Sequence, residues 1–79
     1  MAEPKYIDFK GLSCPLPLLK LKLAMKEQDY SGSWVIEATD VGATRDIPAY
    51  ISSLGGDVVV DTLGNGESRF YRLTISCKA

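Results

Sequence analysis

The chain has 79 residues, 46% of them apolar and 24% charged, and a formal net charge of −1. These proportions exclude a disordered chain, and the near-neutral charge gives no reason to expect non-specific binding to nucleic acid. Two cysteines and no histidine exclude a disulfide framework, a catalytic Cys–His or Ser–His–Asp arrangement and an imidazole metal ligand.

The length predicts a single domain covering residues 1–79, near the lower limit at which one apolar core holds a fold. The sequence begins without the basic and apolar segments of a signal peptide, and no apolar run is long enough to cross a bilayer. We therefore expect a soluble, cytoplasmic protein with no membrane partner. Residues 1–28 carry five lysines against three acidic residues, so a mild positive bias surrounds the first cysteine.

Hydrophobic periodicity and turn residues divide the chain into strands and helices. In chain order the pattern predicts a strand over 6–9, a helix over 15–28, a turn at 31–33, a strand over 34–39, a helix over 43–54, a strand containing 58–60, a hairpin turn at 64–66 and a last strand over 70–77. The order βαβαββ predicts an α/β (α+β) two-layer sandwich, with two helices packed on one face of a four-stranded mixed sheet.

The second helix and the last strand each have one apolar face. In the helix, apolar residues recur at helical spacing at Ile47, Tyr50, Ile51 and Leu54. Pro48 must lie in the first two turns of that helix or kink it. In the strand, alternation places Tyr71, Leu73, Ile75 and Cys77 on one face, which predicts that Cys77 is a buried structural cysteine.

The first cysteine stands at the expected start of the first helix. If Cys14 is the N-cap, Pro15 falls at N1, where proline is favoured, and Pro17 falls at N3. The positive end of the helix would then favour the thiolate, but Pro17 has no amide to donate to it. The sequence therefore predicts a modestly activated thiol; the alternative is a structural cysteine that only caps the helix. A dithiol oxidoreductase is disfavoured because Pro17 occupies the place of the second thiol in a C-x-x-C motif.

The first helix carries two apolar stripes on roughly opposite sides. One consists of Leu18, Leu21 and Met25, and the other of Leu16, Leu19 and Leu23. Because one helix on one sheet cannot easily bury both, we expect the second stripe to be partly exposed and to form a docking or self-association surface. The alternative is a wider contact with the core.

Two separated blocks of sequence resemble the TusA (SirA-like) family of small sulfur-carrier proteins. The first block is Asp8, then Lys10-Gly11-Leu12-Ser13-Cys14-Pro15-Leu16-Pro17 with its CPxP motif, and Lys20. The second is Thr39-Asp40-Val41-Gly42 followed by Arg45-Asp46-Ile47-Pro48. Their order and their expected elements agree with the family over nearly the whole chain.

This resemblance implies the same two-layer sandwich and a sulfurtransferase activity in which Cys14 carries sulfane sulfur as a persulfide. It implies a donor protein of cysteine desulfurase or rhodanese type, an acceptor protein, no metal or other cofactor, and a monomer or weak dimer. The expected supporting residues are Gly11, Pro15, Leu16, Pro17 and Lys20. The expected docking residues are Leu16, Leu19, Leu23, Lys22 and Arg45.

Two other functions stay open. One is a regulatory or protein-interaction module of the same fold, in which Cys14 carries no sulfur. The other is an RNA-binding module, which the acidic balance and the lack of a run of exposed aromatic residues disfavour. We expect no direct nucleic-acid partner.

Overall fold

The computed structural model describes residues 4–29 and 32–77. The elements, in chain order, are β1 (Lys5–Phe9), α1 (Leu16–Glu27), β2 (Gly32–Ala38), α2 (Ala43–Ser53), β3 (Asp57–Leu63), the 3-10 turn Gly66–Ser68 and β4 (Phe70–Cys77). The predicted order βαβαββ is confirmed. Of the turn predicted at 31–33, residue 31 lies outside the described residues, and Gly32 and Ser33 begin β2.

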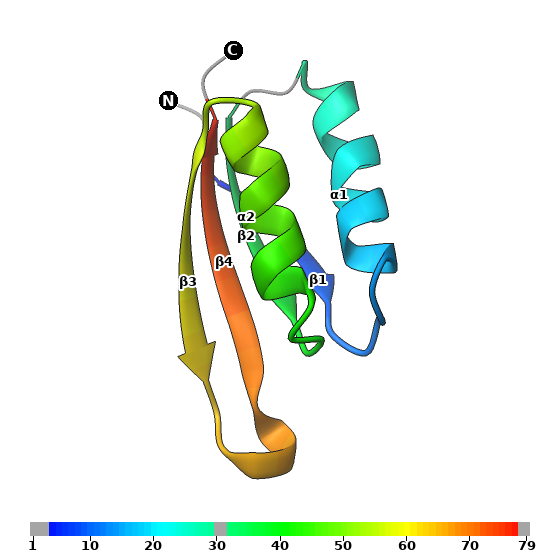
Figure 1. Ribbon diagram of the computed structural model, residues 1–79, viewed down its shortest axis with the longest axis vertical. Coiled ribbons are helices and arrows are strands. Elements are labelled where there is room, and N and C mark those ends of the chain that lie inside the picture. The colour runs from blue at the N-terminus through cyan, green and yellow to red at the C-terminus, as the bar shows by residue number, and fades with distance from the viewer. Residues whose placement is uncertain (1–3, 30–31, 78–79) are drawn as a thin grey trace.

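The four strands form one mixed sheet in the order β1-β2-β4-β3. β1 and β2 pair in parallel, joined through α1, whereas β4 pairs antiparallel with both β2 and β3. Both helices lie on the same face of this sheet, and the far end of the β3–β4 hairpin extends beyond them (Figure 1). The predicted two-layer sandwich is therefore confirmed.

The core lies between the helices and the sheet. Alternate residues of the central strands point toward the helices and are buried, and they meet buried residues of both helices. The core comprises Phe9, Leu21, Met25, Trp34, Ile36, Ala38, Ala43, Ile47, Ile51, Leu73, Ile75 and Cys77. The predicted apolar face of α2 is confirmed, since Tyr50 and Leu54 also pack against this cluster, and Pro48 stands in the second turn of the helix.

The two stripes of α1 have different surroundings. Leu21 and Met25 are fully buried, and Leu18 packs against the core from a half-buried position. On the other side, Leu16, Leu19 and Leu23 are 44%, 47% and 67% exposed. The predicted exposure of the second stripe is thus confirmed, and the core contact of α1 is not wide enough to include it.

The start of α1 differs from the prediction. The N-cap is Pro15, so Leu16 is the first helical residue and Pro17 the second, and no side chain caps the helix. The first helical hydrogen bond runs from the Leu19 amide to the Pro15 carbonyl at 3.1 Å. Cys14 precedes the cap and joins Pro15 through a cis peptide bond. The prediction of Cys14 at the N-cap was therefore wrong by one residue, and Cys14 belongs to the loop between β1 and α1.

Candidate functional site

The two sequence blocks meet at one edge of the sheet. β1 and β2 are parallel neighbours, so the connections that follow them leave the sheet at the same edge. Two hydrogen bonds join these connections: the Gly11 amide donates to Thr39 Oγ1 at 2.9 Å, and the Cys14 amide donates to Asp40 Oδ2 at 3.2 Å. The loop that carries Cys14 is therefore held by the segment that leads into α2.

The absence of a side chain at Gly42 lets the two segments approach closely. Gly42 is the N-cap of α2. A Cβ atom built there would lie 3.4 Å from Cys14 Cβ and 2.9 Å from Asp40 Oδ2. Cys14 thus lies beside the N-terminus of α2 and not at the cap of its own helix.

The Cys14 thiol is exposed and donates a hydrogen bond to Asp46 Oδ2, with the sulfur and the oxygen 2.8 Å apart. This bond raises the pKa of Cys14, because a carboxylate accepts a hydrogen bond from the neutral thiol but repels the charged thiolate. Partial desolvation of the sulfur by its neighbours and the negative charges of Asp46 and Asp40 raise the pKa further, and the charge of Arg45 opposes them. The predicted modest activation is therefore wrong in sign, since the hydrogen bond to Asp46 and the two carboxylate charges raise the pKa of the thiol.

Asp46 is the site residue that sequence reasoning misplaced. The sequence places Asp46 in the second block, where its local context predicts a mainly structural role, in pairing with the sheet or capping the second helix. It stands in α2, 32 residues after Cys14, and reaches the thiol only because β1 and β2 pair in parallel. One sequence signal could have found this contact. The first block follows the first predicted strand and the second block follows the second, and the ends of two parallel neighbouring strands meet at one edge of the sheet.

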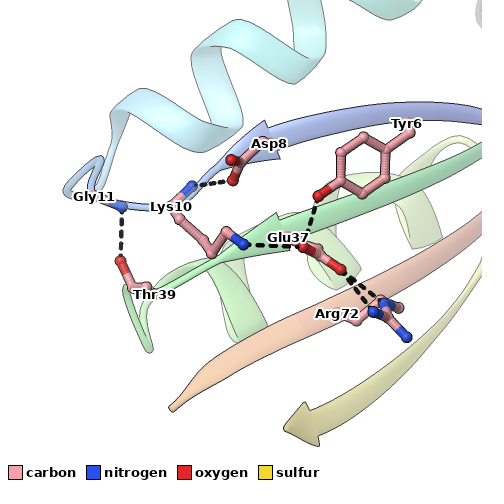
Figure 2. A network of polar contacts seen from close by, with 7 residues as sticks. All are labelled: Tyr6, Asp8, Lys10, Gly11, Glu37, Thr39 and Arg72. Atoms are coloured by element: carbon pink, nitrogen blue, oxygen red, sulfur yellow. Dashed lines mark hydrogen bonds and ion pairs between the residues drawn. The ribbon is translucent and has the colours of Figure 1, made fainter. Parts of the chain in front are cut away.

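A second polar cluster, which we call the Glu37 network, lies on the helix-free face of the sheet (Figure 2). Glu37 is only 5% exposed and accepts a hydrogen bond from the Tyr6 hydroxyl at 2.6 Å. Lys10 Nζ lies 3.3 Å from the same oxygen, Oε1. Arg72 donates to the other oxygen, Oε2, through Nε at 2.9 Å and Nη2 at 2.8 Å. These donors explain how a carboxylate is buried in a sheet of this size.

The network shifts the pKa values of two of its members. The hydrogen bonds from Tyr6 and then Arg72 favour the charged form and lower the pKa of Glu37 to about 2, against the opposing effect of burial. The same bond, followed by burial and the charge of Glu37, raises the pKa of Tyr6 to about 12.

Lys10 connects the Glu37 network to the cysteine loop. Its ammonium group lies beside Glu37 and 4.9 Å from the centre of the Phe70 ring, and its amide donates to Asp8 Oδ1 at 2.9 Å. Gly11 follows directly and is bonded to Thr39. Figure 2 shows the contacts of Lys10 with Asp8 and Glu37 and of Gly11 with Thr39 at the end of β1, where the loop begins. The loop is therefore anchored at Lys10 and Gly11, four and three residues before the thiol.

The other predicted residues are distributed around α1. Lys20 is exposed, and the Lys22 ammonium group lies 5.0 Å from the centre of the Tyr50 ring of α2. Cys77 is buried, as predicted, and burial raises the pKa of its thiol. Across residues 4–29 and 32–77, no three Cys, Asp or Glu side chains cluster as metal ligands would. In the same stretches, no helix has both the length and the apolar character needed to span a membrane.

These features define a class of protein: a small α/β sandwich that presents one exposed thiol ahead of a Pro-x-Pro turn, while its second thiol is buried. The family model described as Sulfurtransferase TusA matches residues 5–75, and the chain belongs to this family.

Relatives within the family cover most of the chain. YrkI of Bacillus subtilis (strain 168) is 39% identical over 62 residues, covering 78% of this chain and 83% of its own. The Sulfur carrier protein TusA of Pseudomonas syringae pv. tomato is 34% identical over 55 residues, covering 70% of this chain and 66% of its own. The Sulfur carrier protein TusA of Allochromatium vinosum is 28% identical over 64 residues, covering 81% and 84%. The family suggested by the sequence blocks is thus confirmed.

Proposed function

We propose that this protein is a sulfur carrier that holds sulfane sulfur as a persulfide on Cys14 and transfers it between two partner proteins. The observation that carries the proposal is the exposure of Cys14 in a loop held in place from two sides, while Cys77 is buried. Family membership supports the same role, because relatives bear the name sulfur carrier protein.

The chemistry needs only one accessible thiol. The Cys14 sulfur attacks the outer sulfur of a donor persulfide, and the donor leaves as a thiolate. A thiol of the acceptor then attacks the outer sulfur carried by Cys14. The outer sulfur passes to the acceptor, and Cys14 leaves as a thiolate. Neither step requires a histidine, which the chain lacks. The donor would be a protein of cysteine desulfurase or rhodanese type.

Mass spectrometry of the intact protein tests the proposal directly. After incubation with glutathione persulfide and removal of the excess reagent, we expect a mass increase of one sulfur atom that maps to Cys14. The Cys14→Ser variant should show no such increase, whereas Cys77→Ser should load like the wild type. If the wild type gains no sulfur, the alternative of a regulatory or interaction module without sulfur transfer is favoured.

The exposed stripe of α1 is the surface that we propose for partner docking. Leu16, Leu19 and Leu23 form an apolar stripe on the helix that directly follows the thiol loop. Lys20, Lys22 and Arg45 add positive charge, which would attract an acidic partner surface.

A negative charge introduced into the stripe tests the docking surface. Leu23→Asp should weaken binding to a sulfur donor or acceptor protein, measured by titration calorimetry, because it removes apolar contact and repels an acidic partner. A matched control is Val59→Asp, a similarly exposed residue on β3 (59% exposed). Equal affinities of wild type and Leu23→Asp would contradict docking. Sedimentation of both proteins shows whether the stripe instead mediates self-association.

A further inference from the structure

The contact between Cys14 and Asp46 bears on which state of the thiol the protein stabilises. Cys14 Sγ and Asp46 Oδ2 lie 2.8 Å apart. Cys14 belongs to the loop before α1 and Asp46 to α2, and the two residues are 32 positions apart in sequence. Asp46 is half-buried, and its own amide is bonded to the Gly42 carbonyl at 2.9 Å inside α2. The helix therefore fixes the backbone of Asp46 beside the thiol loop, within hydrogen-bond reach of Cys14.

The charged groups around the thiol are mostly negative. Asp46 and Arg45 come from α2, and Asp40 comes from the connection after β2. Within the described residues, neither carboxylate is in a salt bridge, since the two ion pairs found there both involve Glu37. The negative charge that faces Cys14 is thus not neutralised by a direct ion pair.

This arrangement treats the empty and the loaded carrier differently. In the empty state the thiol hydrogen is donated to Asp46. Once Cys14 carries a second sulfur, its own sulfur has no hydrogen to donate, and the hydrogen bond from Cys14 Sγ to Asp46 is lost. An ionised persulfide would in addition bring a negative charge next to two carboxylates, at a cost in free energy.

We propose that Asp46 holds the empty Cys14 as a thiol and disfavours the persulfide, so that it biases the carrier toward giving its sulfur away. The proposal rests on the sulfur-carrier function and adds a residue with a defined role to it. Asp46 acts as a release residue: it lowers the affinity of Cys14 for sulfur and leaves the chemistry of transfer to the two thiols.

Both transfer steps balance without an outside oxidant or reductant. On loading, the Cys14 proton passes to water, the Cys14 sulfur bonds to the outer sulfur of the donor, and the donor S–S bond breaks. The bonding pair leaves with the donor's inner sulfur, which takes up a proton. On release, the acceptor thiolate bonds to the outer sulfur, the Cys14 bond to it breaks, and Cys14 regains a proton and its hydrogen bond to Asp46.

The first experiment measures the thiol without any sulfur transfer. The rate of Cys14 alkylation by iodoacetamide is followed from pH 6 to 11, with the modified residue located by peptide mass spectrometry. We expect the wild-type midpoint above that of free cysteine, and a lower midpoint for Asp46→Asn, whose amide donates to a thiolate. At pH 7 the variant should react at least about threefold faster, because well below the midpoint each unit of pKa changes the thiolate fraction roughly tenfold.

Asp29→Asn is the matched control. It makes the same carboxylate-to-amide change after the C-terminal end of α1, a helix of 12 residues whose N-terminal end adjoins Cys14. Asp29 has a φ of 54°, which asparagine adopts readily, so the control should fold and leave the alkylation profile unchanged. An alkylation midpoint of the wild type at or below that of free cysteine would overturn the proposal. This outcome needs no variant, so it holds even if Asp46→Asn does not fold.

The second experiment measures sulfur release. Wild type and Asp46→Asn are equilibrated with fixed ratios of glutathione persulfide to glutathione, and the loaded fraction is read by mass. We expect at least about a threefold higher ratio of loaded to empty protein for the variant, and slower loss of sulfur to added glutathione. Equal loading of the two proteins would overturn the release role. If neither protein loads, the carrier function fails, and the alkylation profile alone still decides whether Asp46 holds the thiol proton.

Discussion

Glu37 and Arg72 lie directly opposite each other on the antiparallel strands β2 and β4, and Arg72 donates two hydrogen bonds to one carboxylate oxygen of Glu37. The other oxygen accepts the Tyr6 hydroxyl from β1 and lies near Lys10 at the start of the thiol loop. One buried carboxylate therefore ties together three strands and the loop, and its contribution to stability is open to measurement.

We expect Glu37→Gln to lower the free energy of unfolding by roughly 1–3 kcal/mol. The glutamine side chain carries no negative charge, and its NH2 group would face the donors of Tyr6, Lys10 or Arg72 in place of a carboxylate oxygen. Urea unfolding followed by circular dichroism measures the change. Glu67→Gln, in the exposed Gly66–Ser68 turn, is the control and should leave stability unchanged. A change below about 0.5 kcal/mol for Glu37→Gln, the range of ordinary surface substitutions, would contradict the prediction.

Stability should depend on pH in two windows set by the Glu37 network. The pKa of Glu37 falls to about 2 on folding, so its contribution is complete above its ordinary pKa and is lost as the pH falls from about 4.5 to 2. The pKa of Tyr6 rises to about 12, so its contribution is complete below pH 10 and is lost as the pH rises from about 10 to 12. Comparing Tyr6→Phe with the wild type isolates the share of the alkaline loss that Tyr6 contributes, which should be missing from the variant, whereas the loss from the raised pKa values of Cys14 and Cys77 should be common to both proteins.

Neighbouring leucines of α1 should respond in opposite ways to truncation. Leu21 is fully buried, so Leu21→Ala should cost about 2–5 kcal/mol through lost burial and the cavity left behind. Leu23 is 67% exposed, so Leu23→Ala should stay within about 0.5 kcal/mol of the wild type. Thermal or urea unfolding of both variants checks this. Similar losses for the two would mean that the assigned faces of α1 are wrong.

The adjacent glycines after α2 should differ in their tolerance of a side chain. A Cβ atom at Gly56 would lie 2.6 Å from Cys77 Sγ and 2.8 Å from the Ser76 carbonyl oxygen, so Gly56→Ala should cost about 3 kcal/mol or more. Gly55 has open space around it but a φ of +80°, so Gly55→Ala should cost only about 1–2 kcal/mol. Urea unfolding of both variants tests this, and Gly56→Ala should have the lower midpoint. A lower midpoint for Gly55→Ala would contradict the close packing of Cys77 against Gly56.

Much of the fold could be predicted because its signals are local. The alternation in the last strand predicted a buried Cys77, and the spacing of Leu21 and Met25 predicted the core face of α1. Helix and strand periodicity depend on neighbours within a few residues, which the sequence displays directly. The exposure of Leu23 followed from the same reasoning.

The state of Cys14 could not be predicted, because it depends on residues far away in the chain. The local pattern suggested a thiol at a helix cap that is stabilised as an anion, and the structure places it before the cap. Its hydrogen-bond partner is Asp46, which donates nothing and raises the pKa of the thiol. The burial of Glu37 was hidden in the same way, since its partners Tyr6, Lys10 and Arg72 lie on other segments.

The sequence by itself determined the order of the elements, the faces of the helices and which cysteine precedes the Pro-x-Pro turn, since short-range periodicity and turn chemistry encode all three. Only the tertiary structure decided what surrounds that cysteine. The parallel pairing of β1 and β2 brings the Cys14 loop against Asp40, Gly42 and Asp46. Strand pairing over this separation decides which charges face the thiol, and a carboxylate at hydrogen-bond distance raises the pKa of Cys14.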